Sequence, residues 1–254
     1  GMEEAIEPMS AFRSERYCFR TDDPQQSVQM PDVPTPTVTL EAVEEQLPYV
    51  RQCQRLGVPV VVANLEMKDP SIDATWTDHA AAMAQGIELL VQFGHRRIGY
   101  IGTNAPYLFY EHTERGYVQA MRQLGMGVDE SLMARTTAHD MPLVLAGFQS
   151  AQQLLNKTDR PTGIVTGRDA FAQGAWIAAE QMGLTVGVDV SLVGYDDVSG
   201  WGMEQPLTTF REPCYEMGSK AAAMLIDRVV NGQRATVERV CFDAELVIRQ
   251  SAGP

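Results

Sequence analysis

The chain has 254 residues, which is enough for one large or two smaller domains with a substantial core. It carries 20 Lys and Arg against 33 Asp and Glu, and the net charge of −13 argues against a broad nucleic-acid-binding surface. No apolar run is long enough to span a membrane, and the N-terminal "GMEEAIEPMS" lacks the basic start and apolar core of a secretory signal. We therefore expect a cytoplasmic protein with no membrane partner.

The cysteines do not suggest a metal or redox motif. The chain contains Cys18, Cys53, Cys214 and Cys241, and no two of them form a CxxC pair. Without a secretion signal we expect them to stay reduced. A free cysteine packs like a small hydrophobic residue, so each of the four is predicted to be a buried thiol.

Strand-like and helix-like segments alternate along the chain. The opening residues are rich in proline and contain one candidate strand, "PTVTL" at 36–40, and the continuous apolar run "VPVVVAN" at 58–64 predicts a buried strand. Further strands are predicted at 97–103, 131–136, 161–167, 190–197 and 240–251, and helices at 80–95, 112–126, 143–156, 169–184 and 212–233. We expect Asp169 to cap the helix it begins. This alternation predicts parallel sheets with helices on both faces.

Polar residues follow two of the predicted strands. "SLVGYDD" ends in Asp196 and Asp197, and "GIVTG" leads into Arg168. Ligands of such sheets bind at the carboxyl ends of the strands, which brings all three residues to a binding edge. Strand alternation directs Asp196 towards a ligand and Asp197 into the turn. A carboxylate suits the hydroxyl groups of a sugar, although an Asx turn or a helix cap also explains an aspartate here.

Several segments resemble, in order, the effector-binding core of the LacI/GalR family of bacterial transcription regulators. The most specific are "GIELLVQFGHRRIGYIG", "RPTGIVTGRDAFAQGAWIAAEQMGLTVGVDVSLVGYDD" and "PLTTFREPCYEMGSKAAAMLIDRVVNG". The resemblance implies a two-lobed periplasmic-binding-protein-like α/β fold, with parallel sheets flanked by helices. The first lobe is expected at 1–100 plus 211–239, and the second at 101–210 plus 240–254. The family's first strand has no clear match, which leaves two alternatives: the chain is a fragment with a truncated first lobe, or its first lobe is rebuilt.

The resemblance also implies a ligand site between the lobes. It places Asp196 where family members accept hydrogen bonds from ligand hydroxyls, and Arg168 where they often carry asparagine. The Arg168 guanidinium grips a ligand carboxylate or phosphate in one interpretation, and pairs with Asp169 or a neighbouring carboxylate in the other. Glu212 matches a ligand-touching position at a crossing between lobes, but it also suits the acidic first turn of the next helix.

Other candidates for the ligand site are aromatic or lie at first-lobe strand ends. Aromatic rings stack on sugar and base faces, but they also fill ordinary cores. Each ring that we place beside the cleft can therefore be either a ligand contact or an ordinary core residue. The candidates are Tyr107, Phe109 and Tyr110 in the loop after the strand at 97–103, Trp201 after the aspartate pair, and Asn64 and Asp78 from the first lobe.

A catalytic site is not apparent in the sequence. His79, His95, His112 and His139 are scattered, and the nucleophile-elbow, P-loop and metalloprotease motifs are missing. His95 belongs to the Gly-His turn and is predicted to be structural. Adjacent strand residues such as Asp196 and Asp197 diverge, whereas glycosidase carboxylates flank one bond from opposite sides. We expect no metal and no cofactor.

Taken with the resemblance, these observations predict the ligand-binding and dimerisation domain of a LacI/GalR-type regulator. The expected partners are a small-molecule effector (a sugar, sugar acid or sugar phosphate) and a second copy of the chain. Operator DNA would be bound only through a head domain that this chain lacks. The alternative is a solute-binding protein of a transporter, and an enzyme that uses the cleft comes third.

Overall fold

The chain folds into two compact α/β units. A computed structural model describes residues 37–40, 47–105, 108–136, 141–198, 206–232 and 236–254. The first unit is formed by the described residues of Gly1–Thr77 together with Pro213–Phe242, and the second by those of Asp78–Glu212 together with Asp243–Pro254. Each unit has its own parallel sheet, as the alternation of strands and helices predicts.

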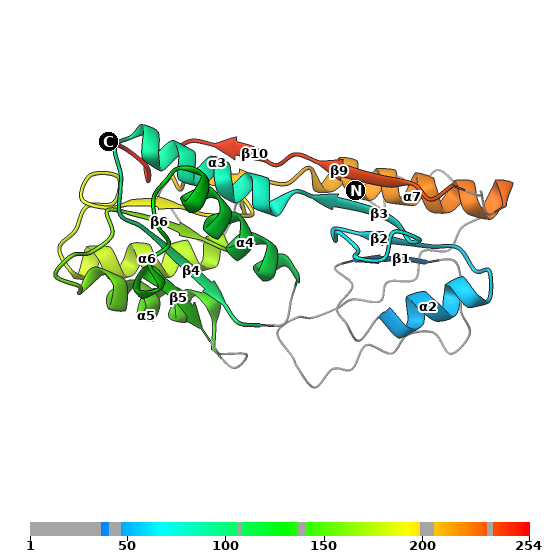
Figure 1. Cartoon of the computed structure of the whole chain (residues 1–254), viewed down its shortest axis with the longest axis horizontal. Helices are drawn as coiled ribbons and strands as arrows, with labels where there is room; N and C mark the ends of the chain where they lie inside the picture. The colour runs from blue at the N-terminus through cyan, green and yellow to red at the C-terminus, as the bar shows by residue number, and fades with distance from the viewer. Residues whose placement is uncertain (1–36, 41–46, 106–107, 137–140, 199–205, 233–235) are drawn as a thin grey trace. The chain divides into compact units, whose positions relative to one another are not determined.

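The sheet of the first unit has four parallel strands in the order β1-β2-β3-β9. These are β1 (Thr37–Leu40), β2 (Val60–Ala63), β3 (Asp73–Thr77) and β9 (Arg239–Phe242). Helix α7 (Cys214–Asn231) packs on β2 and β3, and α2 (Leu47–Arg55) packs on β2 (Figure 1). Every residue of β2 is buried, which explains its continuous apolar sequence.

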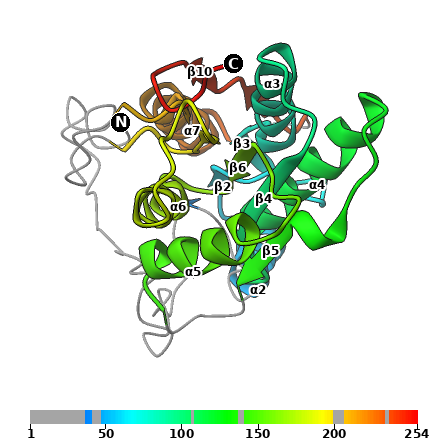
Figure 2. The ribbon, with the colours of Figure 1, turned by 90° about the vertical axis from the view of Figure 1, so that its left-hand side faces the viewer.

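The sheet of the second unit has four parallel strands in the order β5-β4-β6-β7. Figure 2 shows α3 and α4 on one side of this sheet and α5 and α6 on the other. A separate antiparallel pair is formed by β8 and β10. The strands are β4 (Ile98–Thr103), β5 (Met133–Thr136), β6 (Gly163–Thr166), β7 (Ser191–Val193), β8 (Thr209–Arg211) and β10 (Glu245–Val247), and the helices are α3 (His79–Gln92), α4 (Leu108–Gln123), α5 (Leu143–Leu155) and α6 (Asp169–Gln181).

The ends of α3 are set by local side chains. Asp78 caps its start, because Oδ1 accepts a hydrogen bond from the Ala81 amide at 2.9 Å. After its last turn, Gly94 takes φ 98°, and the His95 amide donates back to the Leu90 carbonyl at 3.0 Å. The buried His95 ring lies 2.9 Å from Thr162 Oγ1 and 3.0 Å from Ser191 Oγ, which confirms its structural role.

The structure corrects parts of the predicted organisation. The units divide at Thr77 and not near residue 100, because α3 packs on α4, β6 and β10 of the second unit. The strand predicted at 240–251 is two strands, β9 and β10, which belong to different units. Sequence analysis also missed α2, β3 and β8.

The cysteine prediction is only partly right. Cys53 is buried, whereas Cys214 at the start of α7 and Cys241 in β9 are exposed. Cys18 lies outside the described residues. Within those residues, no helix is both long and apolar enough to cross a membrane.

Helices α5 and α6 touch through their backbones. A Cβ atom added at Gly174 of α6 would overlap the Val144 carbonyl oxygen and the Phe148 amide of α5. A Cβ atom at Gly147 of α5 would likewise overlap the backbone of Phe171 in α6. Glycine is therefore required on both sides of this contact.

We predict that Gly174→Ala lowers the free energy of unfolding by about 2–3 kcal/mol, because the helices must separate to admit the methyl group. Alanine is otherwise favoured over glycine inside a helix by about 1 kcal/mol. Urea denaturation measures the change. Gly127→Ala is the matched control, since a Cβ atom there meets nothing within 4 Å. A Gly174→Ala protein as stable as the parent would contradict the close approach.

Candidate ligand-binding site

Arg168 and Asp196 meet at the carboxyl edge of the second unit's sheet. Strands β6 and β7 are parallel neighbours, so the residues that follow them come together at one edge. The two segments are joined directly, because the Asp169 amide donates to the Tyr195 carbonyl at 2.7 Å. Arg168 Nη1 lies 3.1 Å from Asp196 Oδ1 and 3.3 Å from Oδ2. Of the two interpretations of Arg168, the structure shows the pairing with a neighbouring carboxylate.

The backbone that carries Asp196 is strained. Asp196 has φ 124° and Asp197 has φ 51°, conformations that side-chain-bearing residues rarely adopt. Strand β8 and the residue before it hold this segment, because the Gly194 amide donates to Thr208 O at 2.8 Å and the Asp196 amide to Phe210 O at 3.0 Å. Strain of this kind persists only where the surroundings impose it, and it gathers at functional sites.

Two aromatic rings pack against Arg168. Its Cζ lies 4.5 Å from the ring centroid of Phe109 and 5.8 Å from that of Tyr110. Sequence analysis placed both rings in a loop, but α4 begins at Leu108, and both side chains are buried in its first turn. The rings therefore hold the guanidinium by cation–π contact. Tyr107, the third aromatic candidate, lies outside the described residues.

Asp196 is a poorly solvated carboxylate. Its side chain is only 16% exposed, compared with 28% for Arg168. Burial, together with the charges of Asp169 and Glu212, raises the pKa of Asp196 to about 7 against the opposing effect of Arg168. One arginine pairs with Asp196 while the charges of two further carboxylates act on it, so the charge of Asp196 is incompletely compensated.

Asp169 is not the helix cap that we predicted. Its Oδ1 accepts a hydrogen bond from Thr209 Oγ1 at 2.6 Å, and its Oδ2 accepts one from the Val198 amide at 3.1 Å. Both partners lie outside α6, so these tertiary contacts replace the capping bond. Burial raises the pKa of Asp169, although the bond from Thr209 opposes the shift.

Glu212 takes part in a buried polar cluster with His79 and Tyr195. The Tyr195 hydroxyl donates to Glu212 Oε1 at 3.1 Å, and His79 Nδ1 lies 2.8 Å from that hydroxyl and 3.2 Å from Oε1. Burial, with lesser effects of the charges of His112 and Arg168, lowers the pKa of His79 to about 3. The imidazole is thus neutral, and a proton on Nδ1 satisfies both partners. Sequence analysis missed His79 because its partners lie far along the chain.

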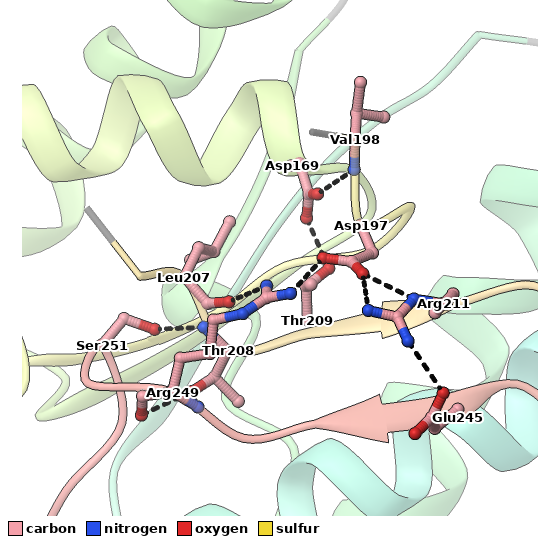
Figure 3. A network of polar contacts seen from close by, with 10 residues as sticks. All are labelled: Asp169, Asp197, Val198, Leu207, Thr208, Thr209, Arg211, Glu245, Arg249 and Ser251. Atoms are coloured by element: carbon pink, nitrogen blue, oxygen red, sulfur yellow. Dashed lines mark hydrogen bonds and ion pairs between the residues drawn. The ribbon is translucent and has the colours of Figure 1, made fainter. Parts of the chain in front are cut away.

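Asp197 has the structural role that strand alternation predicts. Arg211 Nε donates to its Oδ2 at 2.7 Å, and Arg249 Nη2 donates to its Oδ1 at 2.6 Å (Figure 3). Arg211 also reaches Glu245 Oε2 at 3.1 Å. The bonds from Arg249 and Arg211 outweigh the effect of burial and hold the pKa of Asp197 below its usual range. The two adjacent aspartates therefore differ in the direction of their pKa shifts: the pKa of Asp196 is raised and that of Asp197 is lowered.

The remaining candidates are Asp78, Asn64 and Trp201. Asp78 is exposed, and its carboxylate is the cap of α3. Asn64 belongs to the first unit, where it follows β2 with φ 61°. Trp201 lies outside the described residues. Among the residues that the structure does describe, no group of three or more His, Cys, Asp or Glu side chains is arranged to hold a metal ion.

Comparison with known proteins identifies the fold family. Residues 87–252 match the periplasmic binding protein-like domain family. The chain therefore belongs to this family, in the form found in LacI/GalR-type transcriptional regulators. This result confirms the resemblance and the fold class that the sequence predicted.

Individual relatives agree with this assignment. The HTH-type transcriptional repressor CytR of Escherichia coli strain K12 is 33% identical over 199 residues, which cover 78% of this chain and 57% of that protein. A LacI-family regulatory protein from Chloroflexus aggregans has a TM-score of 0.75 at 26% identity, covering 85% of this chain and 76% of that one. A LacI-family regulator from Enterococcus faecium, solved with bound ribose, has a TM-score of 0.72 over 85% of this chain and 79% of that one, and its 22% identity shows the fold alone. The chain spans about half the length of the curated relatives that it matches.

We predict that Asp196→Asn is more stable than the parent by about 2–4 kcal/mol at pH 8.5, because an amide avoids the cost of a poorly solvated charge. Asp196 has a pKa raised from 3.8 to about 7 in the folded chain. The protonated Asp196 side chain thus makes its full contribution to the parent's free energy of unfolding below pH 3.8. This contribution is lost as the pH rises through about 7.

Urea denaturation at a series of pH values measures this difference. The advantage of Asp196→Asn should be nearly constant between pH 8.5 and about 7 and should then shrink as the pH falls towards 4. Asp159→Asn serves as the control, since that side chain is 77% exposed. An advantage of Asp196→Asn that is constant across this pH range would show that Asp196 titrates normally.

Proposed function

We propose that this chain is the ligand-sensing core of a transcriptional regulator and that it binds a sugar or sugar-derived molecule through Asp196. The observation that carries the proposal is the Asp196 carboxylate, held in a strained backbone at the carboxyl edge of a parallel sheet, where such folds bind ligands, and poorly solvated there. A ligand whose hydroxyl groups donate to this carboxylate replaces the solvation that it lacks. The similarity to a transcriptional repressor supports the regulatory role over a transport or enzymatic one.

The charges around Asp196 favour an uncharged ligand. Asp169 and Glu212 already raise the pKa of Asp196, and Arg168 is its only cationic partner among the contacts described. A sugar acid or sugar phosphate would bring a further negative charge into this surrounding. A neutral polyol instead supplies hydrogen-bond donors. Of the effector classes expected from the sequence, we therefore favour neutral sugars.

Regulation would use the two-unit architecture. Ligand-induced closure of two lobes is a common switching motion, and the chain crosses between its units three times. In the full-length regulator, we expect this motion to act through a homodimer on a DNA-binding head. The location of the ligand between the two units stays a prediction.

We expect neutral sugars to raise the thermal unfolding temperature of the chain and matched anions not to do so. D-ribose can be compared with ribose 5-phosphate, and D-glucose with gluconate. For the sugar that binds, Asp196→Ala should weaken affinity by about 10- to 100-fold, the loss expected when hydrogen bonds to a charged group are removed. Calorimetric titration measures the affinity.

Asp159→Ala is the control for this experiment, since Asp159 lies on the surface beside Arg97. It should bind the sugar like the parent. Stronger stabilisation by the phosphate or the gluconate would contradict the preference for neutral ligands. Equal affinity of Asp196→Ala and the parent would remove Asp196 from the site.

A further inference from the structure

The first unit contains a cavity at the amino ends of its parallel strands. The cavity has a volume of about 240 Å³. Its walls come from the segments that lead into β2, β3 and β9 and from the last turns of α2 and α7. Parallel sheets usually bind their ligands at the opposite, carboxyl edge. The cavity is therefore separate from the candidate site around Asp196, with which it shares no residue.

A buried arginine of α7 lines this cavity. The Arg228 side chain is only 6% exposed, and its Nε and Nη2 donate to Asp73 Oδ2 and Oδ1 at 2.8 and 2.9 Å. Nη2 also donates to the Thr236 carbonyl at 3.0 Å. These bonds fix the plane of the guanidinium at the start of β3, because a bidentate pair with a carboxylate allows one orientation.

The third nitrogen of Arg228 is the unusual feature of the cavity. Nη1 is buried and has no hydrogen-bond partner among the residues that the structure describes. Its ion-pair partner, Asp227 Oδ2, lies 4.0 Å away, which is too far for a hydrogen bond. A buried donor that lacks an acceptor destabilises a fold, most of all in a charged group. An acceptor supplied by a ligand would therefore form a favourable bond here.

The rest of the lining is mixed in character. Half of the lining residues are apolar, among them Val58, Pro59 and Ile72. Gln54 and Ser71 add polar groups, and Gln54 Nε2 donates to Ser71 Oγ at 3.1 Å. A cavity of about 150 Å³ is large enough to bind benzene. This cavity therefore has room for one ring that carries a short polar substituent.

The charges around the guanidinium disfavour an anionic ligand. Asp73 already balances the charge of Arg228, and Asp227 adds a second carboxylate. A ligand carboxylate or phosphate would bring a third negative charge to one guanidinium. A neutral carbonyl group supplies the missing acceptor without that repulsion.

We propose that this cavity binds an uncharged molecule of about one ring, whose carbonyl group accepts a hydrogen bond from Arg228 Nη1. Val58, Pro59 and Ile72 contact the ring. Nη1 itself is closed off from solvent, so the cavity wall must yield by a short distance as the carbonyl reaches it. The proposal is independent of the proposed function, because the site lies within the first unit and uses neither Asp196 nor a sugar.

Nicotinamide is a suitable probe, because it joins one ring to a neutral amide carbonyl. In heteronuclear NMR of the chain, it should cause saturable shifts of the amides of residues 71–73 and 236–238. We expect a dissociation constant of about 1 mM, an ordinary affinity for so small a ligand. The absence of saturable shifts there at roughly 20 mM nicotinamide would overturn the proposal.

Nicotinate tests the preference for an uncharged ligand, since it carries a carboxylate on the same ring. It should bind about tenfold more weakly than nicotinamide, because Asp73 and Asp227 repel it. Equal or tighter binding of nicotinate would contradict the ligand class that we propose.

Val237→Trp tests the location of the site without removing any partner of the ion pair. Val237 lines the cavity and is exposed, so a tryptophan there has room to cover the opening. We expect nicotinamide to bind about tenfold more weakly, the effect of losing one ring-sized contact area. Val188→Trp is the matched control, since Val188 is an exposed valine of the second unit. If Val237→Trp binds nicotinamide like the parent, the ligand is not in this cavity.

Arg228→Lys tests the hydrogen-bond donor. Lysine keeps a positive charge beside Asp73, but its single nitrogen cannot hold Asp73 and a ligand carbonyl in the same geometry. We expect a folded Arg228→Lys protein, verified by circular dichroism, to lose about tenfold in nicotinamide affinity. The parent's affinity in this variant would overturn the role of Nη1. Should the variant not fold, Val237→Trp and nicotinate decide the proposal.

Discussion

The ion pair between Arg168 and Asp196 is the interaction on which the candidate site depends. Parallel pairing of β6 and β7 brings the two residues to one edge, and the Phe109 ring holds the guanidinium in place. The pair is imperfect, because a single nitrogen of Arg168 contacts both oxygens of Asp196. A poorly solvated carboxylate with an incomplete set of partners is suited to accept hydrogen bonds from a ligand.

The two adjacent aspartates show how environment divides roles between identical side chains. Asp197 is bound by two arginines and has a lowered pKa, which makes it a structural anchor. Asp196 is bound by one arginine, faces two further carboxylates and has a raised pKa. A single residue step along the chain therefore separates a carboxylate with a raised pKa from one that two arginines hold in place.

Most of the sheet and helix framework could be predicted from the sequence. The strands β2 and β4 were predicted because both of their faces are buried, which makes their sequences continuously apolar. The helices α3 and α5 were predicted because one continuous face of each is buried, which makes their apolar residues periodic. The strand β3, "DATWT", and the strand β8, "TFR", were missed because they are short and are defined by their pairing. The family resemblance supplied the fold that periodicity alone did not.

The site was predicted only in outline. Sequence analysis placed Asp196 and Arg168 at one edge, but it left open whether Arg168 binds a ligand or a carboxylate, since that depends on a contact across 28 residues. The capping role of Asp169 failed because Thr209 and Val198, distant in sequence, compete for its oxygens. His79 carried no local signal, because its partners are Tyr195 and Glu212.

The most direct measurement of the central claim is the proton balance of ligand binding. Calorimetric titration of a binding sugar at pH 7, in two buffers with different ionisation enthalpies, reports protons released or taken up. Hydrogen bonds donated to Asp196 favour its ionised form, so binding should release protons at pH 7, and the release should vanish at pH 9 and in Asp196→Asn. Binding without proton release at pH 7, or release that persists in Asp196→Asn, would contradict the assignment of Asp196 as the ligand acceptor.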